Sequence, residues 1–324
     1  MNEPMKLTAP LKDYLWGGTR LRDEYGKRTE LSKVAESWEL ACHRDGKSVI
    51  ASGTAAGETL EAWLTRAGAE ALGTRAAQFP YFPLLIKLID AHDNLSVQVH
   101  PSDDYALRVE GEYGKTEMWY VVQAAPGAAL YSGFSRPIDA DEFRRRVEER
   151  TIMEVLKRYE VRPGDVFFLP AGRVHAIGAG GFVAEIQQTS DVTYRIYDYD
   201  RVGADGRKRE LHVAEALEAI DYTFYADHRQ PYTPRYDAVV KLIHCPYFTT
   251  HLLDLTTLPM TRDFARLDSF VIYLCMAGGV RLTDDLGHVR TIRRGQTVLL
   301  PATTRQVTLT PDSDGAKLLE TFIA

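Results

Sequence analysis

Cysteine is scarce in this sequence. The 324 residues contain three cysteines, Cys42, Cys245 and Cys275, and no CxxC pair. A disulfide framework or a thiolate zinc site needs more cysteines, or cysteines at closer spacing. We therefore expect buried, reduced thiols and a cytoplasmic protein.

Long apolar runs and an excess of positive charge are also missing. No stretch reaches the ~18 apolar residues of a membrane span, and the first six residues lack the apolar core of a signal peptide. Lys and Arg number 39 against 45 Asp and Glu, for a net charge of -6. We expect neither a membrane nor a nucleic-acid partner. An anionic substrate stays compatible, because a few cations can dominate one cleft.

Short strands dominate the predicted elements, because apolar or alternating segments are separated by Gly, Pro, Asn and Asp. The clearest predicted strands are residues 84–89, 95–100, 118–123, 166–169, 183–187 and 192–197. Helical spacing is confined to residues 60–72, to two short helices from about Asp141 and about Thr151, and to a weaker segment at 213–220. The pattern predicts a mainly β fold, either a β-sandwich or a jelly roll.

A weak internal repeat indicates two units. Residues 162–171 and 293–302 both run from a Gly turn through an apolar strand to Leu-Pro-Ala. Aligning their glycines places His175 opposite Gln306. Two unrelated hairpins could share this pattern by chance, but we prefer two related barrels. We expect a catalytic unit at 1–230 and a β unit without a metal site at 231–324.

Three polar motifs fall on the predicted strands of the first unit. Gln98 and His100 are two residues apart and share a strand face, as do Lys115 and Glu117. Taken singly, such a histidine is more often a core or surface residue, and such a charged pair more often lies in solvent. The third motif, Pro-x-x-x-x-His ending at His175, follows a Gly-Asp turn and is a cupin signature.

Together the motifs supply a metal-ligand set. His100, Glu117 and His175, with Gln98 as a candidate fourth ligand, suit a catalytic zinc ion. The same set also suits non-haem iron or manganese, so ligand type alone does not choose. A separate candidate is Arg195, which shares a strand face with Thr193 and Tyr197. It is either an anion binder or oxyanion stabiliser, or a structural arginine stacked on tyrosine.

Six stretches resemble type I mannose-6-phosphate isomerase in its short bacterial form. The resemblance covers about the first 200 residues, and the run Asp-Asn-Leu-Ser-Val-Gln-Val-His-Pro at 93–101 is its most distinctive part. The matching stretches are residues 14–21, 36–40, 83–101, 114–120, 169–177 and 187–201.

The resemblance implies two cupin barrels, one zinc ion per chain, and interconversion of mannose 6-phosphate and fructose 6-phosphate. It also implies a hexose phosphate as the partner. We expect a monomer or homodimer, between which the sequence does not decide. Gln98, His100, Glu117 and His175 match the family's metal ligands, and Arg195 its active-site arginine. Lys115 matches a lysine of the substrate cleft, and Lys87 lies in a matching stretch with a less defined substrate role.

The sequence departs from the longer family members in two ways. The stretch between Tyr120 and Arg162 is too short for their helical insertion. Gly114 also stands where they carry a histidine, so no proton-carrier role transfers to that position.

The implied reaction passes through an enediol, and Arg195 with Lys115 would either stabilise negative charge near the reacting carbons or bind the phosphate. The base is left open between a zinc-bound water, Lys115 and Asp198. An iron-dependent cupin oxygenase and a non-catalytic sugar-binding cupin are the rival interpretations.

Overall fold

Two antiparallel sheets form the first unit in the computed structural model, which describes residues 3–203 and 206–324. The five-stranded sheet has the order β11 (Leu156–Glu160), β10 (Ala129–Phe134), β13 (His175–Ile177), β8 (Val97–Val99), β15 (Tyr194–Tyr197). The six-stranded sheet has the order β12 (Val166–Leu169), β9 (Glu117–Ala124), β14 (Gly181–Gln188), β7 (Leu84–Asp90), β3 (Glu36–Leu40), β2 (Leu11–Lys12). The N-terminal Met1 and Asn2, part of the segment judged above not to be a signal peptide, lie outside the described residues.

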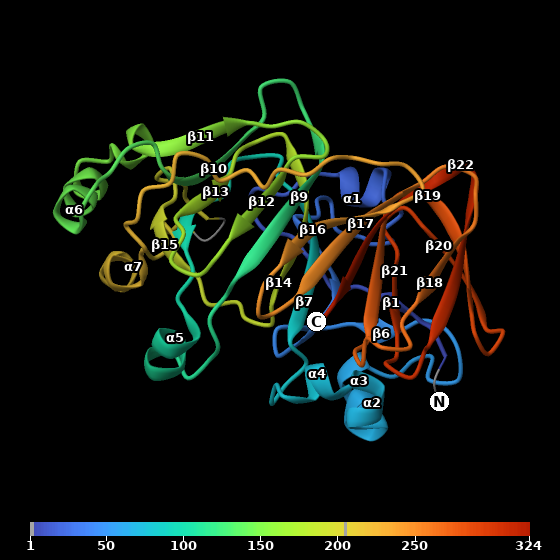
Figure 1. Ribbon diagram of the computed structural model, residues 1–324. Coiled ribbons are helices and arrows are strands. Elements are labelled where there is room, and N and C mark those ends of the chain that lie inside the picture. Colours follow the sequence, from blue (N-terminus) through green and yellow to red (C-terminus); the bar gives the residue numbers. More distant parts are fainter. Residues whose placement is uncertain (1–2, 204–205) are drawn as a thin grey trace.

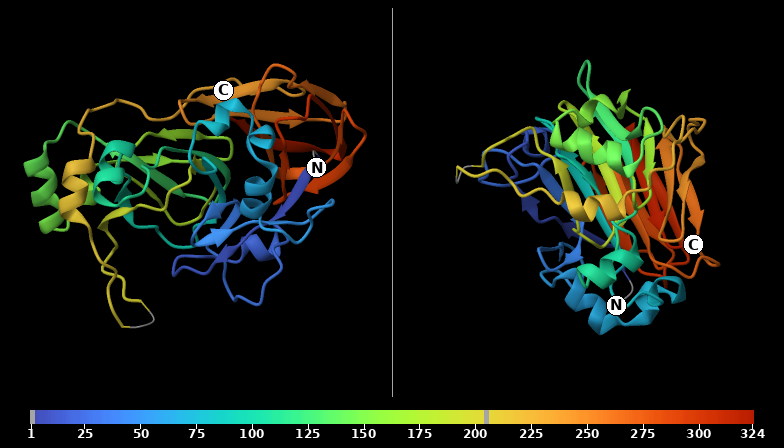
Figure 2. Two further views of the ribbon diagram at one scale, coloured as in Figure 1. Left: turned by 90° about the horizontal axis from the view of Figure 1, so that it is seen from below. Right: turned by 90° about the vertical axis from the view of Figure 1, so that its left-hand side faces the viewer.

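A nine-stranded sheet forms the second unit. Its main path is β16 (Val239–His244), β17 (Thr249–Leu255), β22 (Gln306–Phe322), β19 (Val271–Asp284), β21 (Thr297–Leu300), β1 (Met5–Thr8), β6 (Val49–Ile50). Two further strands attach to it, β18 (Met260–Asp263) on β22 and β20 (Val289–Arg293) on β19. A separate hairpin pairs β4 (Cys42–His43) with β5 (Gly46–Lys47). Figures 1 and 2 show the two β units side by side.

The helices are short and lie outside the sheets (Figure 1). They are α1 (Arg20–Asp23), α2 (Leu60–Ala67), α3 (Ala69–Leu72), α4 (Thr74–Ala77), α5 (Asp103–Val109), α6 (Ala140–Glu148), α7 (Val213–Ala219) and the 3-10 turn η1 (Ile152–Glu154). The Thr59 side chain caps α2 by accepting a hydrogen bond from the Ala62 N–H. Gly68, with φ 70°, ends that helix, so the predicted helix 60–72 is split in two.

The prediction of a helix from about Thr151 is wrong beyond one turn. After η1 the chain pairs with β10 as β11, in which Leu156 and Tyr159 are buried. Long-range strand pairing therefore overrides the local helical preference. The six predicted strands and the helices at 140–148 and 213–219 are confirmed within a few residues, and the fold is mainly β, as predicted.

Because successive side chains of a strand point to opposite faces, the buried apolar residues around the first unit fall into three clusters. Val97 and Val99 point to α6 and α7, on the outer side of the five-stranded sheet. Ile89, Trp119 and other alternate residues fill the space between the two sheets of the first unit. Their neighbours pack on the nine-stranded sheet and form the largest cluster, which joins the two units. Polar residues at positions such as 98 are thereby directed into the first barrel.

The interior of the second unit is mainly apolar instead, although it includes the buried carboxylate of Glu320. Residues such as Tyr273, Val298 and Leu318 fill it, and Gln306 lies exposed at the first position of β22. Gly164 and Gly295, the aligned glycines of the repeat, both have positive φ and precede matching strands. The division at residues 230 and 231 stays a proposal, and the pairing of β1 with β21 adds an N-terminal strand to the second unit.

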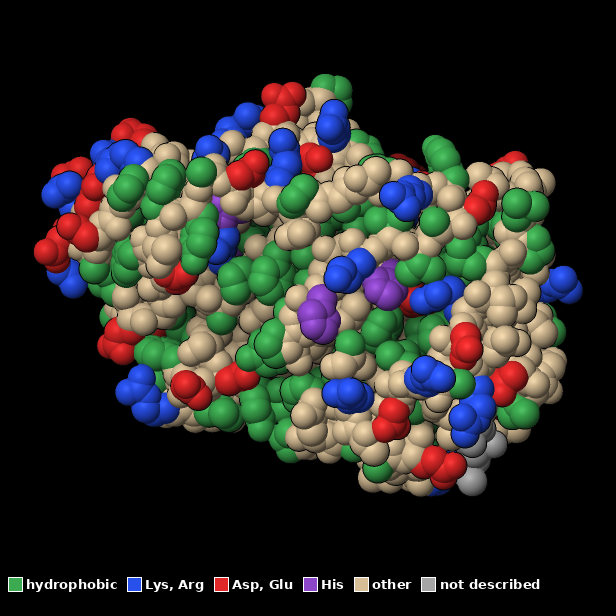
Figure 3. Space-filling view, viewed as in Figure 1, with side chains coloured by type: hydrophobic (Ala, Val, Ile, Leu, Met, Phe, Trp, Pro, Cys, Tyr) green, Lys and Arg blue, Asp and Glu red, His purple; other side chains and the backbone are tan. Residues whose placement is uncertain are grey.

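Three surface and sequence features complete the fold. All three cysteines are free, and Cys275 is fully buried while the other two are partly buried. None of the helices in the described ranges is long and apolar enough to cross a membrane. On the face seen in Figure 3, basic and acidic side chains are interspersed.

Candidate active site

Two rows of side chains face each other across the first barrel. On the five-stranded sheet, Gln98 is paired in register with His175 on one side and with Arg195 on the other. On the six-stranded sheet, Glu185 is paired with Lys87 on one side and Trp119 on the other. Strand pairing thus collects residues that are far apart in the sequence.

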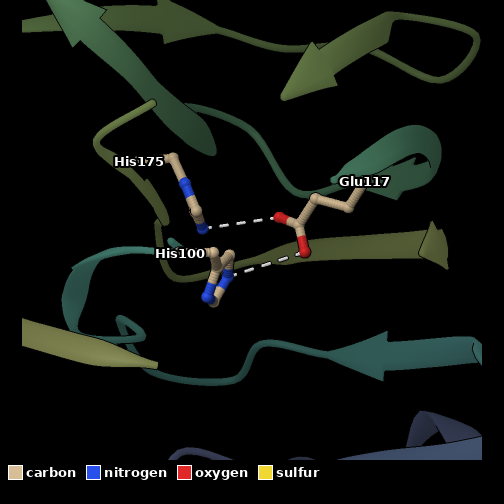
Figure 4. A group of neighbouring side chains, drawn as sticks. All are labelled: His100, Glu117 and His175. Atoms are coloured by element: carbon tan, nitrogen blue, oxygen red, sulfur yellow. Dashed lines mark ion pairs between the residues drawn. The ribbon is translucent and has the colours of Figure 1, made fainter. Parts of the chain in front are cut away.

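The candidate metal ligands His100, Glu117 and His175 meet between these walls (Figure 4). The Nε2 atoms of His100 and His175 lie 3.6 Å and 3.4 Å from the two carboxylate oxygens of Glu117. For metal–ligand bonds near 2.1 Å, neighbouring ligands of a tetrahedral zinc ion lie about 3.4 Å apart. The spacing of these atoms therefore fits a bound cation. Among the residues that the structure describes, no other cluster of His, Cys, Asp and Glu does so.

Backbone carbonyls orient both imidazoles. His100 Nδ1 donates to the Val192 carbonyl at 2.8 Å, and His175 Nδ1 donates to the Arg173 carbonyl at 2.7 Å. This arrangement leaves each Nε2 as a lone-pair donor that faces Glu117. Burial lowers the pKa of His100 well below its ordinary value, with nearby Lys115 adding to the effect, and burial lowers the pKa of His175 to about 3. Both rings are therefore neutral, as metal ligation requires.

Glu117 is the residue that most needs a cation. It is fully buried, its Oε1 has no hydrogen-bond partner within the described structure, and the Lys115 ammonium lies 2.8 Å from its Oε2. Burial, with Glu185 nearby, raises the pKa of Glu117. A buried carboxylate without hydrogen bonds is costly unless a positive charge faces it. Its position between two imidazole nitrogens accordingly fits a divalent metal ion.

Gln98 reaches the same group through its amide. Gln98 Nε2 lies 3.3 Å from His175 Nε2, and Oε1 accepts a long hydrogen bond of 3.4 Å from Ser96 Oγ. Only the amide oxygen can coordinate a cation. Because the amide nitrogen and oxygen exchange places by rotation about one bond, Gln98 lies within reach of the predicted role.

Lys115 supplies a positive charge beside the ligands. Its Nζ lies 2.8 Å from Glu117 Oε2 and 3.0 Å from His100 Nε2. A metal ion and this ammonium would repel each other at such distances, and Glu185, 3.8 Å from Nζ, offers an alternative partner. Lys115 therefore contacts the candidate metal ligands and also lines a cavity between the two sheets.

Lys87 is buried among carboxylates on the six-stranded sheet, which also contains Glu117. Its Nζ lies 3.4 Å from Glu185, 3.6 Å from Glu36 and 3.9 Å from Asp191. Burial alone would lower the pKa of Lys87, but these carboxylates raise it overall. The lysine is thus held as a cation at the cavity surface.

A cavity of about 260 Å³ lies between the two walls. This volume suits a small polar ligand, since drug-sized ligands occupy ~300–1,000 Å³. Lys87, Lys115, Arg195 and Gln98 all line it. Two larger cavities, of about 730 and 370 Å³, lie where the two units meet and contain none of the candidate residues.

Several cavity residues were missed by sequence reasoning. These are Tyr14, Trp16, Glu36, Trp119, Glu185, Asp191 and Arg209. Most of them fall within or beside stretches that carry the family resemblance, which gave them no role. Glu185 can be recognised as a cavity residue only from its pairing with Lys87 in the sheet. Arg209 lies outside all those stretches.

Two expectations about individual residues can now be refined. Asp198 is buried and accepts hydrogen bonds from Arg201 and Arg209, which lower its pKa although burial opposes them, so it is a poor candidate base. Gly114 leaves no room for a side chain, because a Cβ there would lie 2.5 Å from the Asp103 nitrogen. A histidine therefore cannot occupy this position with the present backbone.

Comparisons with known proteins agree with this geometry. Residues 5–117 match the family profile of the catalytic domain of type I phosphomannose isomerase. The chain is 34% identical to the mannose-6-phosphate isomerase of Streptococcus mutans over 308 residues, which are 94% of each chain. It is 43% identical to the probable mannose-6-phosphate isomerase GmuF of Bacillus subtilis over 225 residues, 68% of this chain and 69% of the relative. The crystal structure of a Bacillus subtilis mannose 6-phosphate isomerase superposes with a TM-score of 0.88 at 30% identity, over 99% of each chain.

Proposed function

The chain belongs to the type I phosphomannose isomerase family of enzymes, and we propose that it interconverts mannose 6-phosphate and fructose 6-phosphate through an enediol, with one zinc ion per chain. The observation that carries the proposal is Glu117, a fully buried carboxylate whose two oxygens lie 3.6 and 3.4 Å from the Nε2 atoms of two neutral imidazoles. We further propose a cytoplasmic location and a monomer or homodimer.

His100, Glu117 and His175 would hold the ion, with Gln98 as the fourth ligand. Two imidazoles, one carboxylate and one amide oxygen suit zinc, iron or manganese, and the family resemblance favours zinc. A bound zinc ion would supply Lewis-acid polarisation of the substrate oxygens. The carbonyl partners of both Nδ1 atoms keep the imidazoles oriented for this role.

The remaining cations of the cavity would serve the substrate. An enediolate carries negative charge, and positioned cations in a site shielded from water stabilise such charge. Lys115 lies between Glu117 and Glu185, at 2.8 and 3.8 Å, so we propose that it moves or holds a proton near the reacting carbons. Lys87, held by Glu36 and Glu185 of its own sheet, would bind substrate hydroxyls. Arg195 would face negative charge on the substrate.

The test of the function is a coupled assay for fructose 6-phosphate formed from mannose 6-phosphate. Turnover is expected in the protein as purified, loss of turnover after treatment with a chelator, and recovery on adding Zn²⁺. Absence of turnover in the zinc-loaded protein would refute the function. Oxygen consumption with bound iron would favour the oxygenase interpretation instead.

The ligand assignment has a separate test by metal analysis. His100→Ala and His175→Ala should each lose the bound metal, whereas His244→Ala, an exposed histidine on β16, should keep it. Full metal content in both site variants would exclude these ligands. Because the readout is metal content, it does not depend on the identity of the substrate.

A further inference from the structure

Residues 206–212 lie beside β15 and bring Arg209 to the edge of the cavity. The segment is anchored on β15, because the His212 N–H donates to the Arg195 carbonyl at 2.7 Å and the Arg195 N–H donates to His212 Nδ1 at 3.2 Å. Arg195 and Arg209 both line the cavity that Gln98, Lys87 and Lys115 also line. Two guanidinium groups from different parts of the chain therefore share one end of the cavity.

Arg195 has donor capacity left for a ligand. Its Nη1 donates to the Glu210 carbonyl at 2.8 Å, but its buried Nε has no hydrogen-bond partner in the described part of the chain. Burial, together with the nearby charge of Arg209, lowers the pKa of Arg195. An anion between the two arginines would satisfy the donor and relieve the repulsion.

Asp198 fixes Arg209 in this position. Arg209 Nε donates to Asp198 Oδ2 at 2.8 Å and Nη2 donates to Oδ1 at 2.5 Å, which is a two-pronged pairing. Asp198 also binds Arg201, whose Nη1 donates to the Asn94 carbonyl at 2.5 Å. One buried carboxylate thus binds two guanidinium groups, and Arg195 lies close enough to interact with its charge, so the three arginines outnumber the carboxylate.

The location relative to the metal group agrees with the dimensions of the substrate. Arg195 and His175 lie on strands β15 and β13, which are separated by β8. Two strand spacings amount to roughly 10 Å, which is comparable with the reach of a hexose 6-phosphate from its reacting carbons to its phosphate. The sugar end would lie at the metal ligands and the phosphate end at the arginines.

We infer that Arg209 determines specificity for the phosphorylated sugar: together with Arg195 it binds the phosphate group, and Asp198 is the positioning residue that holds it there. The inference rests on the proposed function, because it assumes a hexose phosphate in this cavity. Guanidinium groups suit this task, since their planar donors match phosphate oxygens. The alternative is that Arg209 only neutralises Asp198.

The experiment compares Arg209→Gln with wild type in the zinc-loaded enzyme. The glutamine can still donate to Asp198 but carries no charge. We expect KM for mannose 6-phosphate, and the inhibition constant of inorganic phosphate, to rise about tenfold to a hundredfold, the usual range for a hydrogen bond to a charged group. We expect kcat within about threefold of wild type and full metal content. Lys208→Ala, a neighbouring cation paired with Asp200, is the matched control and should change neither constant.

The outcomes separate this inference from the proposed function. If wild type does not isomerise mannose 6-phosphate, the proposed function fails. If wild type is active but Arg209→Gln keeps both constants within twofold, Arg209 does not bind phosphate. A fall in kcat with an unchanged inhibition constant also overturns the inference. If the glutamine variant does not fold, Arg209→Lys replaces it in the test. We expect its inhibition constant for phosphate to rise at least threefold, because an ammonium lacks the two parallel N–H donors of a guanidinium group. An unchanged inhibition constant overturns the inference.

Discussion

Replacing Gly114 by alanine should destabilise the protein through backbone contacts alone. The position has no left-handed φ, so alanine could adopt the local conformation. Its Cβ, however, would lie 2.5 Å from the Asp103 nitrogen, 2.5 Å from the Ser102 carbonyl carbon and 2.6 Å from the Pro101 oxygen. These atoms belong to the start of α5 and cannot rotate away as a side chain would.

The size of the effect follows from what must move. Separating the two segments weakens the hydrogen bond from the Gly114 N–H to Asp103 Oδ1, 2.9 Å, and that from the Lys115 N–H to the Pro101 carbonyl, 3.1 Å. Two hydrogen bonds at about 1 kcal/mol each, with about 1–3 kcal/mol of overpacking strain, predict a loss of roughly 3 kcal/mol or more. Lys115 is the next residue, so turnover should fall as well.

The assay is unfolding in urea, with Gly181→Ala as the matched control. Gly181 is also a buried glycine without positive φ, but a Cβ there would have its nearest contact at 3.4 Å. The free energy of unfolding should drop for the first variant and change much less for the second. The reasoning is refuted if the free energy of unfolding of Gly114→Ala lies within about 0.5 kcal/mol of the wild-type value. A change that small is usual for surface substitutions and is incompatible with a backbone clash.

Two further predictions concern Arg195 and Glu320. Arg195→Ala should keep the fold and the bound zinc but lose turnover, as measured by the coupled assay and metal analysis, and near-normal turnover would exclude its role in the reaction. Glu320 is buried in the second unit; although burial raises its pKa, hydrogen bonds from His251, Arg262 and Tyr273 bring the pKa down to about 2. Because the pKa of Glu320 is lowered in the folded state, its contribution to the free energy of unfolding is complete above the unfolded pKa of about 4.5. This contribution is lost as the pH falls from there through about 2. Glu320→Gln should therefore cost about 3 kcal/mol at pH 7, and the gap from wild type in urea unfolding should narrow below pH 4.5; a gap independent of pH would contradict this assignment.

The sequence was most informative where the pattern within a single strand or turn is enough to predict which way a side chain points. The two-residue period placed Gln98 and His100 in register with the barrel interior, and the turn before His175 identified the second imidazole without any knowledge of pairing. The mainly β fold followed from the same pattern. These features are local, so a single sequence contains them.

The remaining parts of the site depend on which strands pair. Glu185 joins Lys87 only through the register of β14 with β7, and Arg209 arrives from a segment without a recognisable pattern. The segment after Thr151 was predicted as helix because its pairing with β10 is not visible locally. The sequence shows that Gly114 departs from the family pattern, but not why a glycine is needed there. The need for glycine follows from the close contact with the backbone at 101–103, which only the folded chain reveals.

The pairing of β1 with β21, with Met5 opposite Leu299, has a consequence for protein synthesis. β1 pairs on one side with the nearby β6, but its partner on the other side, β21, lies at residues 297–300, so that edge of β1 stays unpaired until β21 has been synthesised. Contacts of such sequence separation slow folding and leave a strand edge exposed in the meantime. The catalytic barrel and the C-terminal barrel are therefore expected to fold as one translation product rather than as two independently expressed halves.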